Sequence, residues 1–237
     1  AIFNGFGGIA SALVAIVEYY ERTGKIGEVD ILAGAAISGF HGNIIVYITL
    51  FLSVMVGLIT FTGSFVAFAK LAEWISGKPV KYFMQHYLNL ILFLGSLALA
   101  VLLYLDPANE YYFWYIAAIS FTLGITLTIP IGGADMPVVI SLLNSYAGLA
   151  MAATGFALDN PILIIAGALD GTSGLLLSIK MSKAMNRSWA NVLFGAFGAQ
   201  TAGAVAVRKD LTYRHEPVED AAMVLAKAAA TNPRALA

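Results

Sequence analysis

The chain contains no cysteine and little charge, because Asp, Glu, Lys and Arg together make up only 11% of its 237 residues. The lack of cysteine excludes disulfides, thiolate chemistry and cysteine-ligated metals. Soluble globular proteins carry about 25% charged residues, so this chain lacks the polar surface that keeps a folded domain in solution. With a net charge of −1 and no dense cluster of Lys and Arg, we expect no nucleic acid partner.

Apolar sequence dominates the chain, with 59% hydrophobic residues and a mean hydropathy of +0.82. A helix that spans a bilayer needs about 20 largely apolar residues. Short links between most of the apolar stretches predict antiparallel neighbours, and the stretches lack the strand-like alternation of a membrane barrel. The sequence therefore predicts an all-α fold, a polytopic membrane helix bundle with about six transmembrane helices at 1–20, 43–69, 86–105, 111–131, 136–157 and 161–182.

Composition divides the chain into two parts. Residues 1–188 hold the six apolar stretches, and residues 189–237 pass from Gly- and Ala-rich sequence into a short polar C-terminal tail. We expect the first part to be the transmembrane bundle and the second an interfacial segment and connector. Because Ala1 lies inside an apolar stretch, we also expect the bundle to be incomplete at its N-terminal end.

Lysine and arginine gather on one side of the predicted bundle, and the positive-inside rule places that side in the cytoplasm or the mitochondrial matrix. The other side has Arg22 and Lys25, which are diluted by acidic residues. We therefore expect a bacterial cytoplasmic membrane or the mitochondrial inner membrane, with the C-terminal tail and the lysine-rich links inside. The basic residues that set this orientation are Lys70, Lys78, Lys81, Lys180, Lys183 and Arg187.

Asp135 stands in the run Gly-Gly-Ala-Asp-Met-Pro at 132–137, directly before an apolar stretch. A carboxylate beside the bilayer is costly unless it is hydrated, paired or used, so Asp135 is a candidate for proton handling. The alternative is a plain helix cap, because Asp with Pro137 in the first turn is a good helix start. Asn144 would lie on nearly the opposite side of a regular helix. Either the helix is distorted near Pro137, or water joins its different faces.

Several motifs together are similar to those of one family. Because of these motifs, residues 1–200 resemble the membrane domain of the proton-translocating nicotinamide nucleotide transhydrogenase, the part carried by the bacterial beta subunit. Besides residues 132–137, the matching motifs are Thr60-Phe61-Thr62-Gly63-Ser64, Val66-Ala67-Phe68, Leu143-Asn144-Ser145-Tyr146, Gly167-Ala168-Leu169 and Lys183-Ala184-Met185-Asn186-Arg187-Ser188.

The resemblance implies that this chain is the proton-conducting segment of an enzyme that couples transmembrane proton movement to hydride transfer between NAD(H) and NADP(H). It implies that both nucleotides bind to partner domains and that further transmembrane helices complete a dimeric assembly. Asp135 matches the family's acid at the membrane surface, and Asn144 matches a polar residue of its proton path. Glycines of the tightly packed helices match Gly155, Gly167, Gly171 and Gly174.

No Gly-x-Gly-x-x-Gly lies between a strand and a helix in this sequence, so we expect no cofactor site, no metal and no hydride-transfer site in this chain. The tail from about residue 200 resembles the connector to the missing NADP-binding domain. For Asn144 the alternative role is a helix–helix hydrogen bond that only holds the bundle together.

Two positions depart from the family pattern. Asn4 stands where many members have a proton-path histidine, and it can only orient water or a neighbour because it cannot ionise. We expect none of His41, His86 and His215 to replace that histidine. Asp170 falls near the middle of the last stretch, where an unpaired carboxylate is costly. It is either an ionisable member of the path, or a neutral acid bonded to a carbonyl or hydroxyl, or a local change without a role.

Three functions therefore remain open. The first is the proton-conducting segment. The second is a catalytically inactive, transhydrogenase-derived structural subunit of a larger membrane complex, which Asn4 favours. The third is an unrelated transporter or channel, whose mark would be paired inverted halves with broken helices.

Overall fold

The computed structural model of this chain describes residues 1–23, 44–80, 82–107 and 109–186. His41, His215 and the predicted connector at 189–237 lie outside the described residues. The described part is all-helical, as predicted. Its long helices are α1 (Ile2–Arg22), α3 (Ile44–Leu71), α4 (Gln85–Leu105), α5 (Glu110–Thr128), α6 (Met136–Ala157) and α7 (Pro161–Ala184). Each is long and apolar enough to cross a membrane, which confirms the six predicted spans.

The helix ends follow local chemistry. α7 begins at Pro161 behind Asn160, whose side chain accepts hydrogen bonds from the backbone N–H groups of Ile162 and Leu163. α5 ends at Thr128, three residues before the predicted end at 131. The reason is Pro130, which has no N–H to continue the helical hydrogen bonds.

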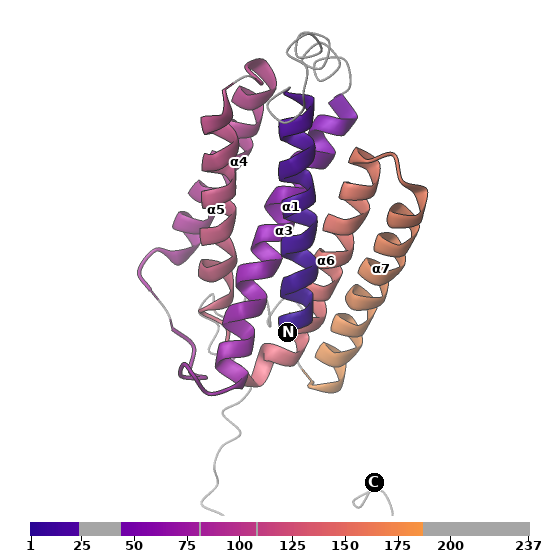
Figure 1. Cartoon of the computed structure of the whole chain (residues 1–237). Coiled ribbons are helices and arrows are strands. Elements are labelled where there is room, and N and C mark those ends of the chain that lie inside the picture. Colours follow the sequence, from indigo (N-terminus) through magenta and orange to yellow (C-terminus); the bar gives the residue numbers. More distant parts are fainter. Residues whose placement is uncertain (24–43, 81, 108, 187–237) are drawn as a thin grey trace, which may run out of the picture. The chain divides into compact units, whose positions relative to one another are not determined.

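The helices run up and down in antiparallel order, with α3 and α6 in the middle (Figure 1). α3 packs against α1, α5 and α6, and α6 also packs against α1 and α7, while α4 packs against α5. In the most apolar window of α3 and of α6, 61% of residues are buried, against 17% in α4 and 22% in α7. The exposed faces of α4 and α7 carry large aliphatic side chains, which suits contact with lipid.

Small residues bring the central helices together, as expected where lipid is as apolar as the helices themselves. An added Cβ at Gly8 of α1 would lie 2.6 Å from the carbonyl oxygen of Gly57 of α3. An added Cβ at Gly148 of α6 would lie 2.5 Å from the Cα atom of Gly171 and 2.7 Å from the carbonyl oxygen of Gly167. The backbones of α6 and α7 are therefore in direct contact.

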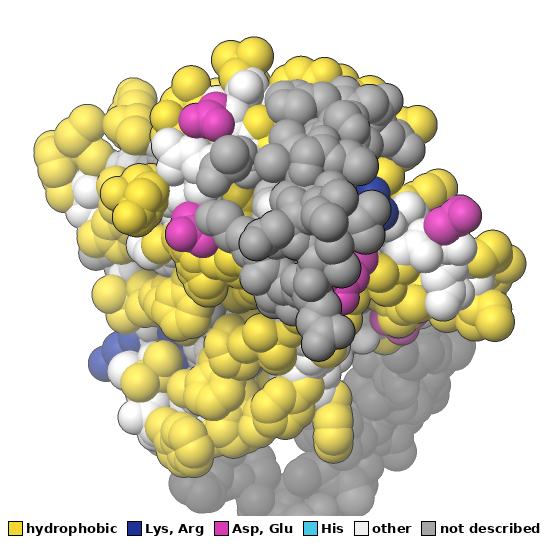
Figure 2. All heavy atoms as spheres, turned by 45° about the horizontal axis from the view of Figure 1, so that its top comes forward, with side chains coloured by type: hydrophobic (Ala, Val, Ile, Leu, Met, Phe, Trp, Pro, Cys, Tyr) yellow, Lys and Arg dark blue, Asp and Glu magenta, His cyan; other side chains and the backbone are white. Residues whose placement is uncertain are grey.

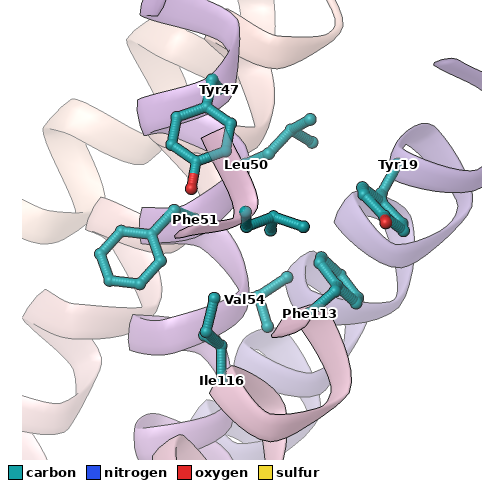
Figure 3. Close-up of a pocket in the computed structure, with 8 residues that line it drawn as sticks. Tyr19, Tyr47, Leu50, Phe51, Val54, Phe113 and Ile116 are labelled. Carbon is teal, nitrogen blue, oxygen red and sulfur yellow. The ribbon is translucent and has the colours of Figure 1, made fainter. Parts of the chain in front are cut away.

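An apolar cluster fills the space between α1, α3 and α5 near one end of the bundle (Figure 3). The rings of Tyr19 and Phe113 stack with centroids 4.3 Å apart, and the Tyr19 hydroxyl donates to the carbonyl oxygen of Pro107 at 3.0 Å. The cavity left between these side chains measures about 10 Å³, which is at the lower limit for one water molecule. This region is core and not a ligand site.

The two ends of the bundle differ in charge. Figure 2 faces the end where α4 meets α5 and α6 meets α7, and acidic side chains stand out there among hydrophobic ones. The described lysines belong to the other end, which includes the turn that carries Asp135. One expectation was wrong: Lys70 is not part of an open basic link. It lies in the last turn of α3 and is only 3% exposed, because α3 continues to Leu71 and packs beneath the link that leaves α5.

Candidate functional site

The turn that carries Asp135 is a short 3-10 helix, η1 (Gly133–Asp135), which leads into α6 at Met136. Asp135 occupies the N-cap position of α6, but its side chain makes no capping hydrogen bond. The carboxyl group of Asp135 is partly buried. Of the two alternatives left open by the sequence, the structure has a local change of helix type near Pro137, because this 3-10 turn precedes the regular path of α6.

A line of polar groups, which we call the α6–α7 stripe, runs between these two helices. On α7 it comprises positions 170, 174, 178 and 182, which share one face because they are spaced by four. Asn144 Nδ2 donates to Asp170 Oδ1 at 3.1 Å, and Ser141 Oγ donates to the carbonyl oxygen of Gly174 at 2.9 Å. One turn further, Ser178 Oγ donates to the carbonyl oxygen of Val138 at 3.3 Å. The stripe therefore leads from mid-bundle toward the end of α6 at which Asp135 lies.

Asn4 joins this arrangement from the opposite side of α6. Its Nδ2 donates to the carbonyl oxygen of Ile140 at 3.0 Å, and in a regular helix that carbonyl also accepts from the N–H of Asn144. Beside it, the fully buried Ser64 of α3 lies against Gly5, where an added Cβ would come within 3.3 Å of the Ser64 Cβ. Among the described residues the Ser64 hydroxyl has no hydrogen-bond partner. Asn4 thus contacts the same turn of α6 that presents Asn144.

The structure brings three of the four predicted site residues together and leaves one apart. Asn144 is hydrogen-bonded to Asp170, and Asn4 bonds the backbone carbonyl of Ile140, which lies one turn of α6 from Asn144. Asp135 lies just before the first residue of α6, Met136, which is about 12 Å along the helix axis from Asn144. The hydroxyls of the stripe occupy the interval between them.

The four glycines predicted to pack all lie at the contact between α6 and α7. An added Cβ at Gly174 would lie 2.6 Å from the backbone nitrogen of Ser145 and 3.1 Å from Asn144 Nδ2. Gly167, Gly171 and Gly155 likewise face the backbone of the partner helix at 2.5 to 3.2 Å. Glycine at these positions therefore allows the polar side chains of the stripe to meet.

Two parts of the site were missed from the sequence. Ser178 and Ser182 are buried between α6 and α7, and the signal that could have found them is their spacing of four from Asp170. The second is Lys70, whose buried ammonium group contacts the link before η1. No sequence signal distinguishes Lys70 from the exposed lysines that follow it.

Nothing in the described residues suggests a bound metal, because they contain no cluster of three or more His, Asp or Glu side chains that could hold one. His86, the histidine that the structure describes, lies in the first turn of α4, with Nε2 3.5 Å from the Gln85 amide nitrogen. It is in a different helix from the residues of the stripe.

The fold and this arrangement define a polytopic helical membrane protein with an internal line of polar groups, a feature that usually marks function in a membrane bundle. The profile of the family described as NAD(P) transhydrogenase beta subunit matches residues 1–231. Two relatives named NAD(P) transhydrogenase subunit beta, one from Rhodospirillum rubrum and one from a designated strain of that species, are each 44% identical over 230 residues. The aligned region makes up 96% of this chain and 47% of each relative, so the chain spans about half their length. This chain belongs to the NAD(P) transhydrogenase beta subunit family.

Proposed function

We propose that this chain is the proton-conducting membrane segment of a transhydrogenase, in which proton movement across the membrane is coupled to hydride transfer between NAD(H) and NADP(H). The single observation that carries the proposal is the α6–α7 stripe. It lies inside an apolar bundle of the transhydrogenase beta subunit family and leads toward the Asp135 turn. Buried polar groups at membrane depth are costly and are retained where a path needs them.

The stripe can hold water along its length. Each hydroxyl that donates to a backbone carbonyl still has two lone pairs that accept hydrogen bonds from water. Ser141 and Ser178 are anchored in this way. The buried Ser64 hydroxyl beside Asn4 supports a further water there, since a buried polar atom without a protein partner usually has a solvent one. Protons would move along such waters, because the side chains between Asp135 and Asn144 cannot ionise.

Asp135 and Asp170 are the ionisable groups of the proposed path. Asp135 is the acid at the lysine-rich end of the bundle, which we place in the cytoplasm or matrix, facing the partner domain that binds NADP(H). Asp170 takes over proton binding within the bundle, where Asn4 cannot, and Asn144 orients its carboxyl group. The nucleotides, the hydride-transfer site and the remaining transmembrane helices of a dimeric assembly belong to other parts of the enzyme.

The test is the Asp135→Asn variant in the complete transhydrogenase assembly, reconstituted in sealed vesicles. NADPH-linked proton uptake is measured with a pH-sensitive dye, alongside hydride transfer to a nicotinamide analogue. We expect proton uptake to fall by about 100-fold, the scale that one acid–base group contributes. The matched control is Asp159→Asn at the opposite end. Asp159 is exposed with φ 51°, a conformation that Asn also adopts readily, so this variant should behave as wild type.

Two results would decide against the proposal. Proton uptake at the wild-type level in Asp135→Asn would show that Asp135 is not part of the proton path. Purification of the chain with unrelated membrane subunits and without nucleotide-binding domains would favour the inactive structural subunit, the reading that Asn4 supports.

A further inference from the structure

The C-terminal end of α5 is held by side chains from other segments. Pro130 has no N–H, so the carbonyl oxygen of Thr126 loses its helical donor, and the Tyr82 hydroxyl donates to it instead at 3.2 Å. Three residues further along, the carbonyl oxygen of Ile129 accepts from Lys70 Nζ at 2.5 Å and from the backbone nitrogen of Val80 at 3.5 Å. The link that leaves α5 is thus fixed by contacts made from α3 and from the segment that follows it.

Lys70 makes the strongest of these contacts. Its ammonium group also donates to the carbonyl oxygen of Ile131 at 2.6 Å, so two of its three N–H bonds hold one short link. A lysine near the end of a membrane helix usually extends its charge into water. Lys70 is instead 3% exposed, and among the described residues no carboxylate lies within ion-pair distance of it. Its charge rests on the carbonyl dipoles at the negative end of α5, where a cation is favoured.

The link that Lys70 holds leads directly into the Asp135 turn. Ile131 is buried against Ala67 and Met136, and Gly133 N–H donates to the carbonyl oxygen of Gly77 at 2.7 Å. Lys70, Glu73, Ser76, Gly77 and Gly133 line an open hollow of about 460 Å³ beside the turn. Only three residues separate Ile131, the nearer of the two Lys70 contacts, from Asp135, so the position of the link influences the position of the acid.

We infer that Lys70 is a positioning residue for proton coupling: its buried ammonium group, held on the Ile129 and Ile131 carbonyls, fixes the link from which Asp135 is presented. The expected effect of Lys70 on proton coupling rests on the proposed function. Its expected effect on the position of the Asp135 turn does not. Methionine at this position has a similar length and no donors, so Lys70→Met releases the link. Arginine retains the charge and several donors, so Lys70→Arg retains the contact.

The experiment measures the turn and the coupling separately in the complete assembly. Since this chain has no cysteine, Ala134→Cys supplies a single thiol on it, at an exposed position next to Asp135, for a nitroxide spin label. Electron paramagnetic resonance reports the mobility of the label, and vesicle assays report proton uptake per hydride transferred. Lys78→Met is the matched control, because Lys78 is exposed at the same end of the bundle.

In Lys70→Met we expect a more mobile label and proton uptake per hydride lowered by about tenfold, the equivalent of one lost charge-assisted hydrogen bond. Lys70→Arg should restore both, and Lys78→Met should change neither. Wild-type mobility and coupling in Lys70→Met would overturn the inference. If Lys70→Met does not assemble, Lys70→Leu replaces it, because leucine also has no donor, and an unchanged label in that variant is equally decisive against the inference.

The Asp135→Asn variant, run in parallel, separates the two proposals. If Asp135→Asn keeps its proton uptake, the proposed function fails, while the spin label still reports whether Lys70 fixes the turn. If Asp135→Asn loses uptake and Lys70→Met does not, only the role of Lys70 is refuted.

Discussion

Gly148 lies where the backbones of α6 and α7 touch, and its replacement by alanine tests whether the stripe depends on that contact. The new Cβ would meet the backbone nitrogen of Gly171, its Cα atom at 2.5 Å and the carbonyl oxygen of Gly167 at 2.7 Å. All three are backbone atoms, so no side chain can rotate away. To reach ordinary contact distance, α6 and α7 must separate locally by roughly 1 Å.

A separation of that size affects stability and the site together. Overpacking of this kind costs about 1–3 kcal/mol, so we expect Gly148→Ala to unfold at a lower denaturant concentration in detergent. The Asn144–Asp170 hydrogen bond, now 3.1 Å long, would stretch beyond the range in which such bonds form. Proton uptake should therefore fall in Gly148→Ala while the assembly is still intact.

The matched control is Gly95→Ala in α4, where an added Cβ meets nothing within 4 Å. Alanine is the better helix former by up to about 1 kcal/mol, so this variant should be as stable as wild type or slightly more so. Unchanged stability and proton uptake in Gly148→Ala would refute the close contact between α6 and α7 and, with it, the register that brings Asn144 to Asp170.

Two further predictions concern Asp170 and the orientation. Asp170→Asn keeps a hydrogen-bonding group next to Asn144 but cannot carry a proton. If Asp170 relays protons, we expect proton uptake to fall by roughly tenfold or more at unchanged stability. Normal uptake in an intact complex would show that Asp170 is only a packing residue. Lys78→Cys should react with a membrane-impermeant maleimide from the side on which NADPH is supplied, and Asp159→Cys only from the other side. The reverse labelling pattern would invert the proposed orientation.

The helices of this bundle could be predicted because each needs only length and apolar content. Six apolar stretches of about 20 residues correspond to six spanning helices, and the stretch predicted to begin at residue 161 corresponds to α7, which begins at Pro161. α5 was predicted too long because its apolar sequence continues past Thr128, while the backbone stops at Pro130. Hydropathy indicates which residues can contact lipid. The position at which α5 ends depends instead on the missing backbone N–H of Pro130.

The pairing of side chains was less accessible from the sequence. α7 carries polar side chains at exposed as well as buried positions, such as the exposed Thr172 and Ser173, so the sequence does not mark which polar residues point toward α6. Asn144 and Asp170 lie 26 residues apart, and both were singled out, but separately. Their short connecting link was the available signal, because antiparallel neighbours place residues on either side of a tight turn at similar depth. The exact register then depends on Gly148, Gly167 and Gly171, which only the packed backbones reveal.

Lys70 shows why charge alone misleads at a membrane face. The positive-inside rule counts lysines and takes each as solvated, which suits Lys78 and Lys183 but not the buried Lys70. Its ammonium group is accommodated because the carbonyls of Ile129 and Ile131 lie beyond the end of α5, which Pro130 sets, and so accept no helical hydrogen bonds within α5. The same proline ends α5 and lets the chain turn through η1, which takes Asp135 out of α6. The end of α5 thus leaves the acceptors for the cation and begins the link to the turn that presents the acid.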